Sequence, residues 1–171
     1  MRIAVFSDSH RMVSRMVAAV EALSPDVILH LGDHIADARQ LRARFPGVPV
    51  HMVAGNCDLY GGDHGETEQL LELGGCRILM THGHVYGVKS GLDALIRRGA
   101  ETGAALALYG HTHAALIKQA RGVWLMNPGQ MESDSSSRRA SCGVVTADNG
   151  SFSCEHFWLH RGAGGAIAGG A

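Results

Sequence analysis

Apolar residues alternate between short strand-like runs and longer helix-like segments in the first third of the chain. This pattern predicts strands at residues 3–6, 27–31 and 50–53, separated by helices at 11–23 and 36–45. Such alternation is typical of βαβ units with parallel strands. Apolar residues recur at helical spacing in the first predicted helix, so we expect one of its faces to pack on the sheet.

The pattern changes in the second half, where strands predominate. Two runs, 68–73 and 77–80, flank Gly74-Gly75, and a two-residue glycine turn predicts a β-hairpin. One further helix is expected at about residues 89–101. Short strands are then expected at 106–109, 116–118, 123–126, 143–147 and 152–158. Two sheets that face each other, with helices outside, would accommodate both halves.

Length and composition favour one domain. The chain has 171 residues, 46% of them hydrophobic, which is enough to close a single core. We expect that domain to span residues 1–160, with an exposed Ser/Arg-rich loop at 132–139. Residues 161–171 are almost wholly glycine and alanine, which predicts a disordered tail.

The charge and the cysteine content limit the classes of binding partner and the cellular compartment that we expect. A net charge of -1 gives no overall field that favours nucleic acid or an anionic membrane. Apolar runs are too short to cross a bilayer, so we expect no membrane association. The four cysteines lack the close paired spacing of a zinc site, and the chain opens on a strand-like run without a secretory signal. We therefore expect a cytoplasmic protein.

Polar side chains follow five of the apolar runs, at the point where each run ends. They offer two carboxylates, one carboxamide and four imidazoles, which are suitable ligands for borderline-hard divalent metals. A pair of such metals indicates phosphate-ester hydrolysis. The five motifs are Asp8-Ser9-His10, Gly32-Asp33, Gly55-Asn56-Cys57-Asp58, Thr81-His82-Gly83 and Gly110-His111-Thr112-His113.

Simple geometry suggests how these motifs form a site. Asp8 and His10 are two positions apart, so both would project to the same side of an extended segment. Gly32 would let the backbone approach closely beside Asp33. Asn56 would ligate through a neutral amide oxygen without adding charge that repels a phosphate.

The motif series resembles the calcineurin-like metallophosphoesterase superfamily. The chain also resembles the small phosphodiesterase branch of this superfamily, the YfcE type, in four further features. These are the sequence at Gly55–Asp58, the sequence at Thr81–His84, the turn at Asn127–Gly129 and the short length. The resemblance covers residues 3–158. It implies a four-layer α/β/β/α sandwich of two mixed β-sheets flanked by helices, which agrees with the pattern described above.

The resemblance also implies two metal ions and their ligands. Asp33 would bridge the two ions. Asp8, His10 and His113 would complete the first site, and Asn56, His82 and His111 would complete the second. With a bridging hydroxide, such a centre would carry a net charge of about +1, which suits a phosphodiester monoanion. We therefore predict hydrolysis of a small phosphodiester by attack of the metal-bridging hydroxide.

Three residues beside the ligands are further candidates for catalysis. Cys57 stands where many family members have a histidine, for which the resemblance implies leaving-group protonation or phosphate stabilisation. Without that imidazole, we expect activated aryl diesters to react better than alkyl esters. The alternative is a small packing residue. Asp58 would either orient a ligand histidine or serve as a turn or helix cap. His84 would either contact substrate phosphate or be an ordinary strand-end histidine.

Several functional alternatives remain open at this stage. The same site could serve a phosphomonoesterase or a nuclease, because loops rather than ligands choose the substrate. A non-catalytic scaffold is the third alternative, since the superfamily includes a retromer subunit of that kind. Nucleic acid is an unfavoured substrate, because no aromatic and basic surface is evident. An unpaired edge strand would permit a homodimer. Manganese is the expected metal by resemblance, and the ligands also admit iron, cobalt, nickel or zinc.

Overall fold

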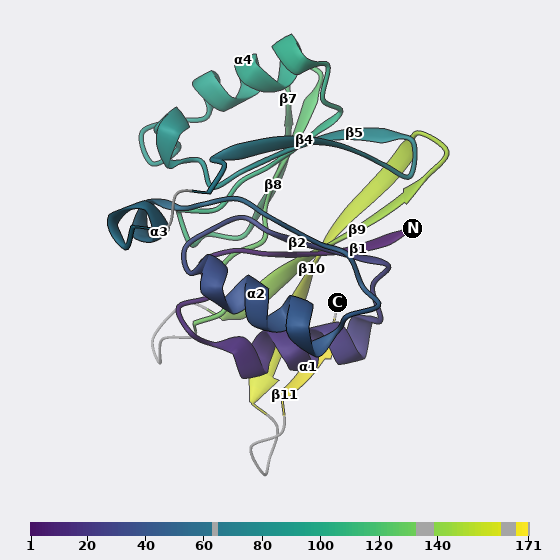
Figure 1. Cartoon of the computed structure of the whole chain (residues 1–171). Helices are drawn as coiled ribbons and strands as arrows, with labels where there is room; N and C mark the ends of the chain where they lie inside the picture. The colour runs from purple at the N-terminus through teal and green to yellow at the C-terminus, as the bar shows by residue number, and fades with distance from the viewer. Residues whose placement is uncertain (63–64, 133–138, 162–166, 171) are drawn as a thin grey trace.

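A computed structural model of the chain describes residues 1–62, 65–132, 139–161 and 167–170. In these residues, two mixed β-sheets pack face to face and helices cover the outer face of each (Figure 1). The resulting layer order is helix, sheet, sheet, helix. The four-layer sandwich predicted from the sequence is confirmed.

The first sheet has the strand order β11-β10-β9-β1-β2-β3. Its strands β1, β2 and β3 run parallel, as the alternating pattern predicts, whereas β9, β10 and β11 are antiparallel additions. Pairing of β1 with β9 joins the two ends of the chain in one sheet. The strands are β1 (Arg2–Phe6), β2 (Val27–His30), β3 (Val50–Met52), β9 (Ala140–Asp148), β10 (Ser151–Arg161) and β11 (Ile167–Gly170).

The second sheet has the order β4-β5-β6-β8-β7. The predicted hairpin is present: β4 and β5 are antiparallel, and Gly74 and Gly75 have φ values of 59° and 78°. Two consecutive positive φ angles define a hairpin turn that glycine adopts without strain. The strands are β4 (Glu68–Leu73), β5 (Cys76–Thr81), β6 (Leu106–Leu108), β7 (Leu116–Ala120) and β8 (Val123–Asn127).

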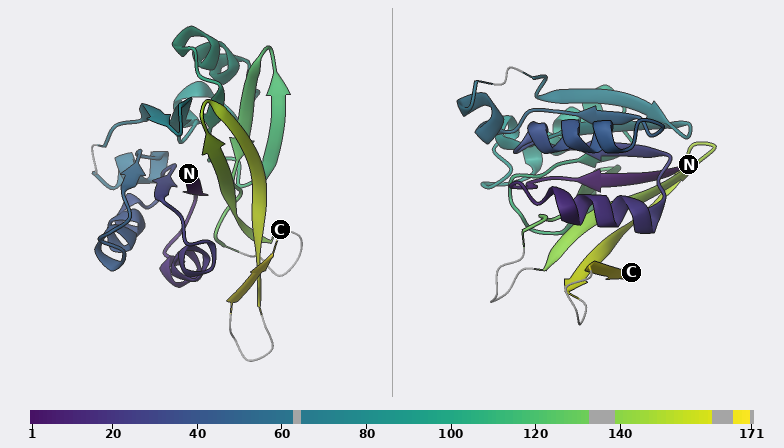
Figure 2. Two further views of the ribbon diagram at one scale, coloured as in Figure 1. Left: turned by 90° about the vertical axis from the view of Figure 1, so that its right-hand side faces the viewer. Right: turned by 60° about the horizontal axis from the view of Figure 1, so that its bottom comes forward.

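Helices α1 (Val13–Leu23) and α2 (Ile35–Arg44) lie side by side on the outer face of the first sheet (Figure 2). Helix α4 (Asp93–Thr102) covers the second sheet. It begins four residues later than its predicted start at residue 89, because Gly91, with φ of 157°, belongs to the preceding loop. No helix in the described part of the chain is both long and apolar enough to cross a membrane.

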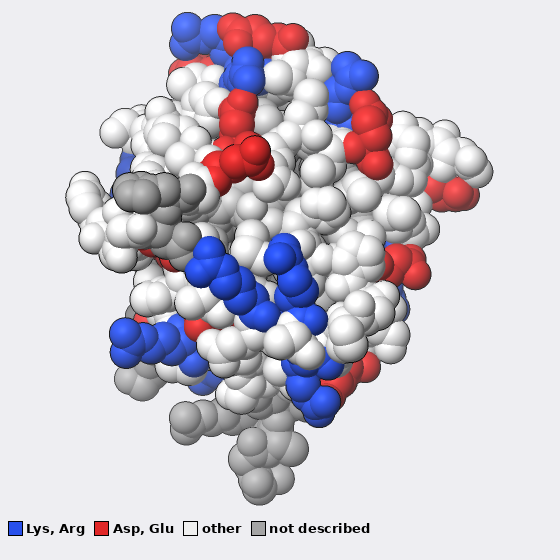
Figure 3. Space-filling model, viewed as in Figure 1, with Lys and Arg blue, Asp and Glu red and all other residues white. Residues whose placement is uncertain are grey.

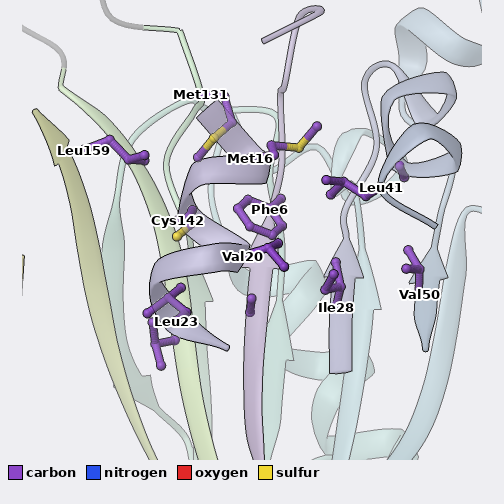
Figure 4. Close-up of a cluster of buried hydrophobic side chains, with 14 of the residues drawn as sticks. Phe6, Met16, Val20, Leu23, Ile28, Leu41, Val50, Met131, Cys142 and Leu159 are labelled. Carbon is purple, nitrogen blue, oxygen red and sulfur yellow. The ribbon is translucent and has the colours of Figure 1, made fainter. Parts of the chain in front are cut away.

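Alternate residues of the central strand β1 face two different cores. Ala4 and Phe6 pack against α1 and α2, in the cluster of buried side chains shown in Figure 4. Ile3 and Val5 point the other way, into the core between the two sheets. Because both faces of the strand are covered, its sequence is continuously apolar rather than alternating.

The carboxyl-terminal region differs from the disorder predicted for residues 161–171. Arg161 ends β10, and Ile167–Gly170 form β11, which pairs antiparallel with β10. Backbone hydrogen bonds to an open strand edge need no large side chains, so a Gly/Ala sequence can add a strand there. Residues 162–166 and 171, and positions 133–138 of the predicted Ser/Arg loop, lie outside the described residues.

Candidate metal centre

The five motifs lie at or just beyond the carboxyl ends of β1, β2, β3, β5 and β6, and their loops contact one another. Asp8 N donates to Gly32 O at 3.1 Å, which joins the first two loops. Gly110 N donates to His82 O at 3.1 Å, which joins the loops of the second sheet. Because carboxyl ends of parallel strands meet at one edge, residues far apart in sequence converge on a single site.

Glycine is required where the second and third loops touch. A Cβ atom on Gly32, whose φ is 95°, would lie 2.5 Å from Gly55 N. A Cβ atom on Gly55 would lie 2.2 Å from Asp33 Oδ1. Both distances are shorter than any normal contact, so the close backbone approach predicted at Gly32 is confirmed.

Asp8, His10 and His113 form one cluster of potential metal ligands, which we call the first donor group. One ligand atom from each lies within 4.8 Å of the others. Asp8 is fully buried, and its Oδ1 lies 3.1 Å from His113 Nε2. The rings of His10 and His113 have centroids 5.2 Å apart. The three side chains therefore surround a space of the size that one metal ion needs.

Unpaired atoms of the first donor group fit a cation. Asp8 Oδ2 accepts hydrogen bonds from Ser7 Oγ at 2.6 Å and from His111 N at 3.0 Å. In contrast, the buried atom His10 Nε2 has no hydrogen-bond partner among the described residues, and Asp8 Oδ1 has no close polar neighbour named there except His113 Nε2, at 3.1 Å. An unsatisfied buried polar atom is costly, and a divalent metal would satisfy both atoms at once.

Asp33, His82 and His111 form a neighbouring cluster, the second donor group, whose ligand atoms also lie within 4.8 Å of one another. His82 Nε2 lies 3.4 Å from Asp33 Oδ1 and 3.2 Å from His111 Nδ1. Asn56 Oδ1 is 3.2 Å from the same His82 nitrogen, so the amide belongs to this cluster too. On the opposite side of the His82 ring, Nδ1 is 2.8 Å from the carbonyl oxygen of Leu31, which orients the ring.

The two donor groups correspond to the two ligand sets that the family resemblance implies. Asp8, His10 and His113 fall in the first, and Asn56, His82 and His111 fall in the second. The structure places the Asp33 carboxylate with the second group. Its bridging role between two metals stays a prediction.

The local backbone differs from the extended segment predicted for Asp8 and His10. Both residues have left-handed conformations, with φ of 51° and 44°. Asp33, His111 and His113 also have positive φ values, of 53°, 67° and 59°. Such conformations cost about 1 kcal/mol or more per non-glycine residue and concentrate at functional sites. The side chains converge because the backbone turns sharply after each strand.

Protonation differs between the two donor groups. Burial raises the pKa of Asp8, but the neighbouring His113, His82 and Ser7 outweigh burial and hold that pKa below its usual value. Contact with Asp8 in turn raises the pKa of His113. In the second group, burial together with the charges of His82 and Lys89 lowers the pKa of His111 to about 4. His111 is therefore neutral at pH 7 and ready to ligate.

Asp58 has the contacts of a helix-capping residue, the second of its two predicted roles. Its Oδ1 accepts hydrogen bonds from the backbone N–H groups of His34 and Ile35, each at 2.8 Å, where α2 begins. Its Oδ2 accepts from Gly55 N at 2.8 Å, at the start of α3 (Asn56–Tyr60). One carboxylate thus holds together the loops that carry Asp33 and Asn56.

Cys57 is exposed, and both its backbone and its thiol contact the second donor group. Its N–H donates to Asp33 Oδ1 at 2.9 Å. The thiol sulfur lies 3.5 Å from Asn56 Nδ2. Burial and the neighbouring Asp33 carboxylate raise the pKa of the thiol to about 11, so the thiol stays protonated at pH 7.

His84 lies in a short 3₁₀ helix, η1 (His84–Tyr86), next to the second donor group. Its ring centroid is 5.4 Å from that of His82 and 6.2 Å from that of His111. Its Nδ1 is buried without a hydrogen-bond partner among the described residues. Burial and the neighbouring His82 lower the pKa of His84, so a neutral ring nitrogen is available beside the candidate metal centre.

Sequence reasoning missed several residues that support the donor groups. Ser7 hydrogen-bonds Asp8, and Gln130 contacts His113. Lys89 lies close enough for its charge to lower the pKa of His111. Ser7 directly precedes the first motif, which is a usable signal. Gln130 and Lys89 carry no motif and reach the site only through the fold.

Comparisons with known proteins identify the family of this chain. The family model of the calcineurin-like phosphoesterase superfamily domain matches residues 1–150. A probable metallophosphoesterase of Bacillus subtilis, YsnB, is 34% identical over 152 residues, covering 87% of this chain and 86% of its own. A phosphodiesterase of Methanocaldococcus jannaschii is 23% identical over 151 residues, covering 76% of this chain and 84% of its own.

A solved structure shares the whole fold. Vps29 of Chaetomium thermophilum superposes with a TM-score of 0.77 at 18% identity, covering 99% of this chain and 93% of that one. At this identity the similarity concerns the fold alone. The family assignment instead rests on the match to residues 1–150 and on the similarity to YsnB, and on both grounds the chain belongs to the calcineurin-like phosphoesterase superfamily.

Proposed function

We propose that this protein is a metal-dependent phosphodiesterase that hydrolyses a small phosphodiester with two divalent metals. The observation that carries the proposal is the adjacency of two separate donor groups. Asp8, from the first group, accepts a hydrogen bond from the backbone of His111, from the second. Two metals held side by side suit a phosphoryl group, which presents several oxygens at once.

When bound, two divalent ions would supply positive charge for the phosphate and lower the pKa of a water molecule from 15.7 to about 7. The residues of this chain fit that role by charge. Asp8 and Asp33 contribute the two negative charges of the donor groups, while Asn56 and the histidines ligate as neutral groups. The resulting positive centre would attract a phosphodiester monoanion without a separate basic pocket.

His84 is the side chain that we propose contacts the substrate phosphate. Its ring lies beside both His82 and His111, and its buried Nδ1 has no partner among the described residues. A neutral imidazole carries one N–H donor and one acceptor nitrogen. The neutral ring can therefore donate its one N–H to a phosphate oxygen.

Cys57 leads us to propose a preference for good leaving groups. A thiol with a pKa of about 11 is a poor proton donor at pH 7, and no imidazole occupies this position. A leaving alkoxide needs a proton, whereas an aryl oxide leaves without one. The proposed substrate class is therefore an aryl or otherwise activated phosphodiester.

The charges on the face shown in Figure 3 favour a small substrate over a nucleic acid. Figure 3 shows acidic and basic side chains interspersed on one face of the molecule rather than a continuous basic track. Binding along a nucleic acid backbone requires a row of phosphate contacts from lysine and arginine.

The test is a side-by-side assay of bis(p-nitrophenyl) phosphate and p-nitrophenyl phosphate on chelator-treated protein to which Mn²⁺ is returned. Iron, cobalt, nickel and zinc would be tested in parallel. We expect faster hydrolysis of the diester and no activity before metal is added. Preference for the monoester would indicate a phosphatase. Absence of hydrolysis with every metal would favour a non-catalytic scaffold.

A further inference from the structure

A buried chain of polar side chains lies directly beneath the first donor group. It consists of His30 at the end of β2, Ser9 between the ligands Asp8 and His10, and Asp37 in α2. His30 and Ser9 are fully buried, and Asp37 is 3% exposed. His30 Nε2 is 3.1 Å from Ser9 Oγ, and Ser9 Oγ is 2.8 Å from Asp37 Oδ2. The proposed hydrolysis assigns none of the three residues a role.

The directions of the hydrogen bonds in this chain follow from its ends. Gly32 N donates to His30 Nδ1 at 3.3 Å, so Nδ1 is the acceptor and Nε2 carries the proton. His30 therefore donates to Ser9, and Ser9 donates to the Asp37 carboxylate. Burial lowers the pKa of His30 to about 4, which keeps the ring neutral. Each donor in the chain has an acceptor, so the network is satisfied despite its burial.

Asp37 holds the loop at a second point. The same Oδ2 that binds Ser9 also accepts from Arg11 N at 2.8 Å. His10 lies between these two anchors with φ of 44°, and Arg11 has φ of 67°. The anchors therefore bracket the metal-ligand candidate whose backbone is strained.

Without such anchors, the loop would relax. Asp8, His10 and Arg11 are all left-handed, a conformation that costs about 1 kcal/mol or more per non-glycine residue. Strain of this kind persists only where surrounding contacts enforce it. The hydroxyl of Ser9 also lies 3.3 Å from the carbonyl oxygen of Asp33, a longer contact to the neighbouring loop.

We propose that His30, Ser9 and Asp37 are positioning residues that hold Asp8, His10 and Arg11 in their left-handed conformations and thereby set the metal affinity of the first donor group. The proposal rests on the proposed function only in taking that group as a metal site. Ser9 acts through its neighbours Asp8 and His10, and Asp37 acts through Ser9 and Arg11.

The test is calorimetric titration of chelator-treated, full-length protein with Mn²⁺ alone. His10→Ala and His82→Ala would first assign the two binding events to the two donor groups. In Ser9→Ala we expect about tenfold weaker binding at the first group, the lower end of the effect seen for residues that support metal ligands. Binding at the second group should change less than at the first. Thr102→Ala, which removes a hydroxyl from the far end of α4, is the control and should leave both affinities unchanged.

If Ser9→Ala does not fold, a second pair of variants tests the proposal. Asp37→Asn retains an oxygen that can accept from both Ser9 and Arg11, whereas Asp37→Ala retains none. We expect Asp37→Asn to bind metal at the first group nearly as the wild type does, and Asp37→Ala to bind about tenfold more weakly.

Two results would overturn the proposal. One is unchanged affinity at the first group in Ser9→Ala or Asp37→Ala. The other is equal weakening at both groups in proportion to a lowered melting temperature, which marks a purely structural role. Because the readout is metal binding, absence of phosphodiesterase activity would defeat the proposed function and leave this test intact.

Discussion

The two donor groups are built from similar motifs but are supported differently. The ligands of the second group are held mainly by backbone: Leu31 O orients His82, and Cys57 N holds Asp33, while the Asp58 carboxylate joins their loops. The ligands of the first group depend more on side chains: besides the backbone N–H of His111, Ser7 holds Asp8, and the buried His30–Ser9–Asp37 chain supports the loop. Backbone contacts survive most substitutions, whereas side-chain contacts can be removed singly. Single substitutions should therefore change the metal affinity of the first group more readily than that of the second.

The two donor groups also differ in the pKa values of their histidines. Contact with Asp8 raises the pKa of His113 in the first group, while burial and nearby positive charges lower that of His111 in the second to about 4. A metal therefore competes with a proton at His113 up to a higher pH than at His111. The two groups should therefore separate experimentally by both mutation and pH.

The largest predicted effect is the loss of the second donor group. In Asp33→Ala, removal of the carboxylate beside His82 should abolish metal binding at that group. Hydrolysis of bis(p-nitrophenyl) phosphate should fall by about 10³-fold, because a metal supplies several kcal/mol of transition-state stabilisation. Steady-state kinetics with excess Mn²⁺ would measure the effect. Activity within a few fold of wild type would contradict a catalytic role for this group.

The second-largest predicted effect is a difference between the two groups in the pH dependence of metal binding. Below the raised pKa of His113, affinity at the first group should fall by up to about tenfold per pH unit, because each bound metal must release one proton. His111, with a pKa of about 4, adds no such dependence between pH 5 and 7. Mn²⁺ titrations at several pH values would show this, and parallel pH profiles for both sites would refute the distinction.

A smaller effect is predicted for the capping carboxylate that both loops of the second group share. Asp58→Ala removes three hydrogen bonds to backbone N–H groups of His34, Ile35 and Gly55. Loss of such a cap should lower the free energy of unfolding by about 1–2 kcal/mol. Urea denaturation of metal-free protein would measure it. The same experiment on Asp93→Ala, an exposed residue in the first turn of α4, serves as the control.

The smallest predicted effect concerns the leaving group. Cys57→His places an imidazole beside Asn56, where it can protonate a leaving alkoxide. Turnover of an alkyl phosphodiester should rise several fold, while that of bis(p-nitrophenyl) phosphate should change little. Cys57→Ala, which adds no proton donor, is the matched control. A failure of the histidine variant to improve alkyl turnover would remove the support for our view of this position.

Much of the fold could be predicted because its signals are local. The apolar runs of β1, β2 and β3 and the Gly74-Gly75 turn each follow from adjacent residues. Helix α3 was missed because it has only five residues, and one of them, Asn56, is a predicted metal ligand. Strand β11 was missed because backbone pairing with β10, rather than side-chain burial, forms it.

The candidate site likewise has residues that could be predicted from local motifs and residues that could not. All seven predicted ligands lie in or beside the two donor groups. They could be predicted because a motif at the end of a strand indicates both the type of the ligand and its place at the edge of the sheet. The supporting residues were not predictable by this route. His30 and Asp37 are ordinary residues of a strand and a helix, and only the packing of α2 on the first sheet brings Asp37 to the Asp8–Arg11 loop.

The measurement that tests the central claim most directly is anomalous diffraction from crystals grown with Mn²⁺ and without chelator. The account predicts two peaks at the manganese edge, one among Asp8, His10 and His113 and one among Asp33, Asn56, His82 and His111. Both peaks should be lost after chelator treatment. A single peak, or peaks outside these side chains, would contradict the two-metal centre.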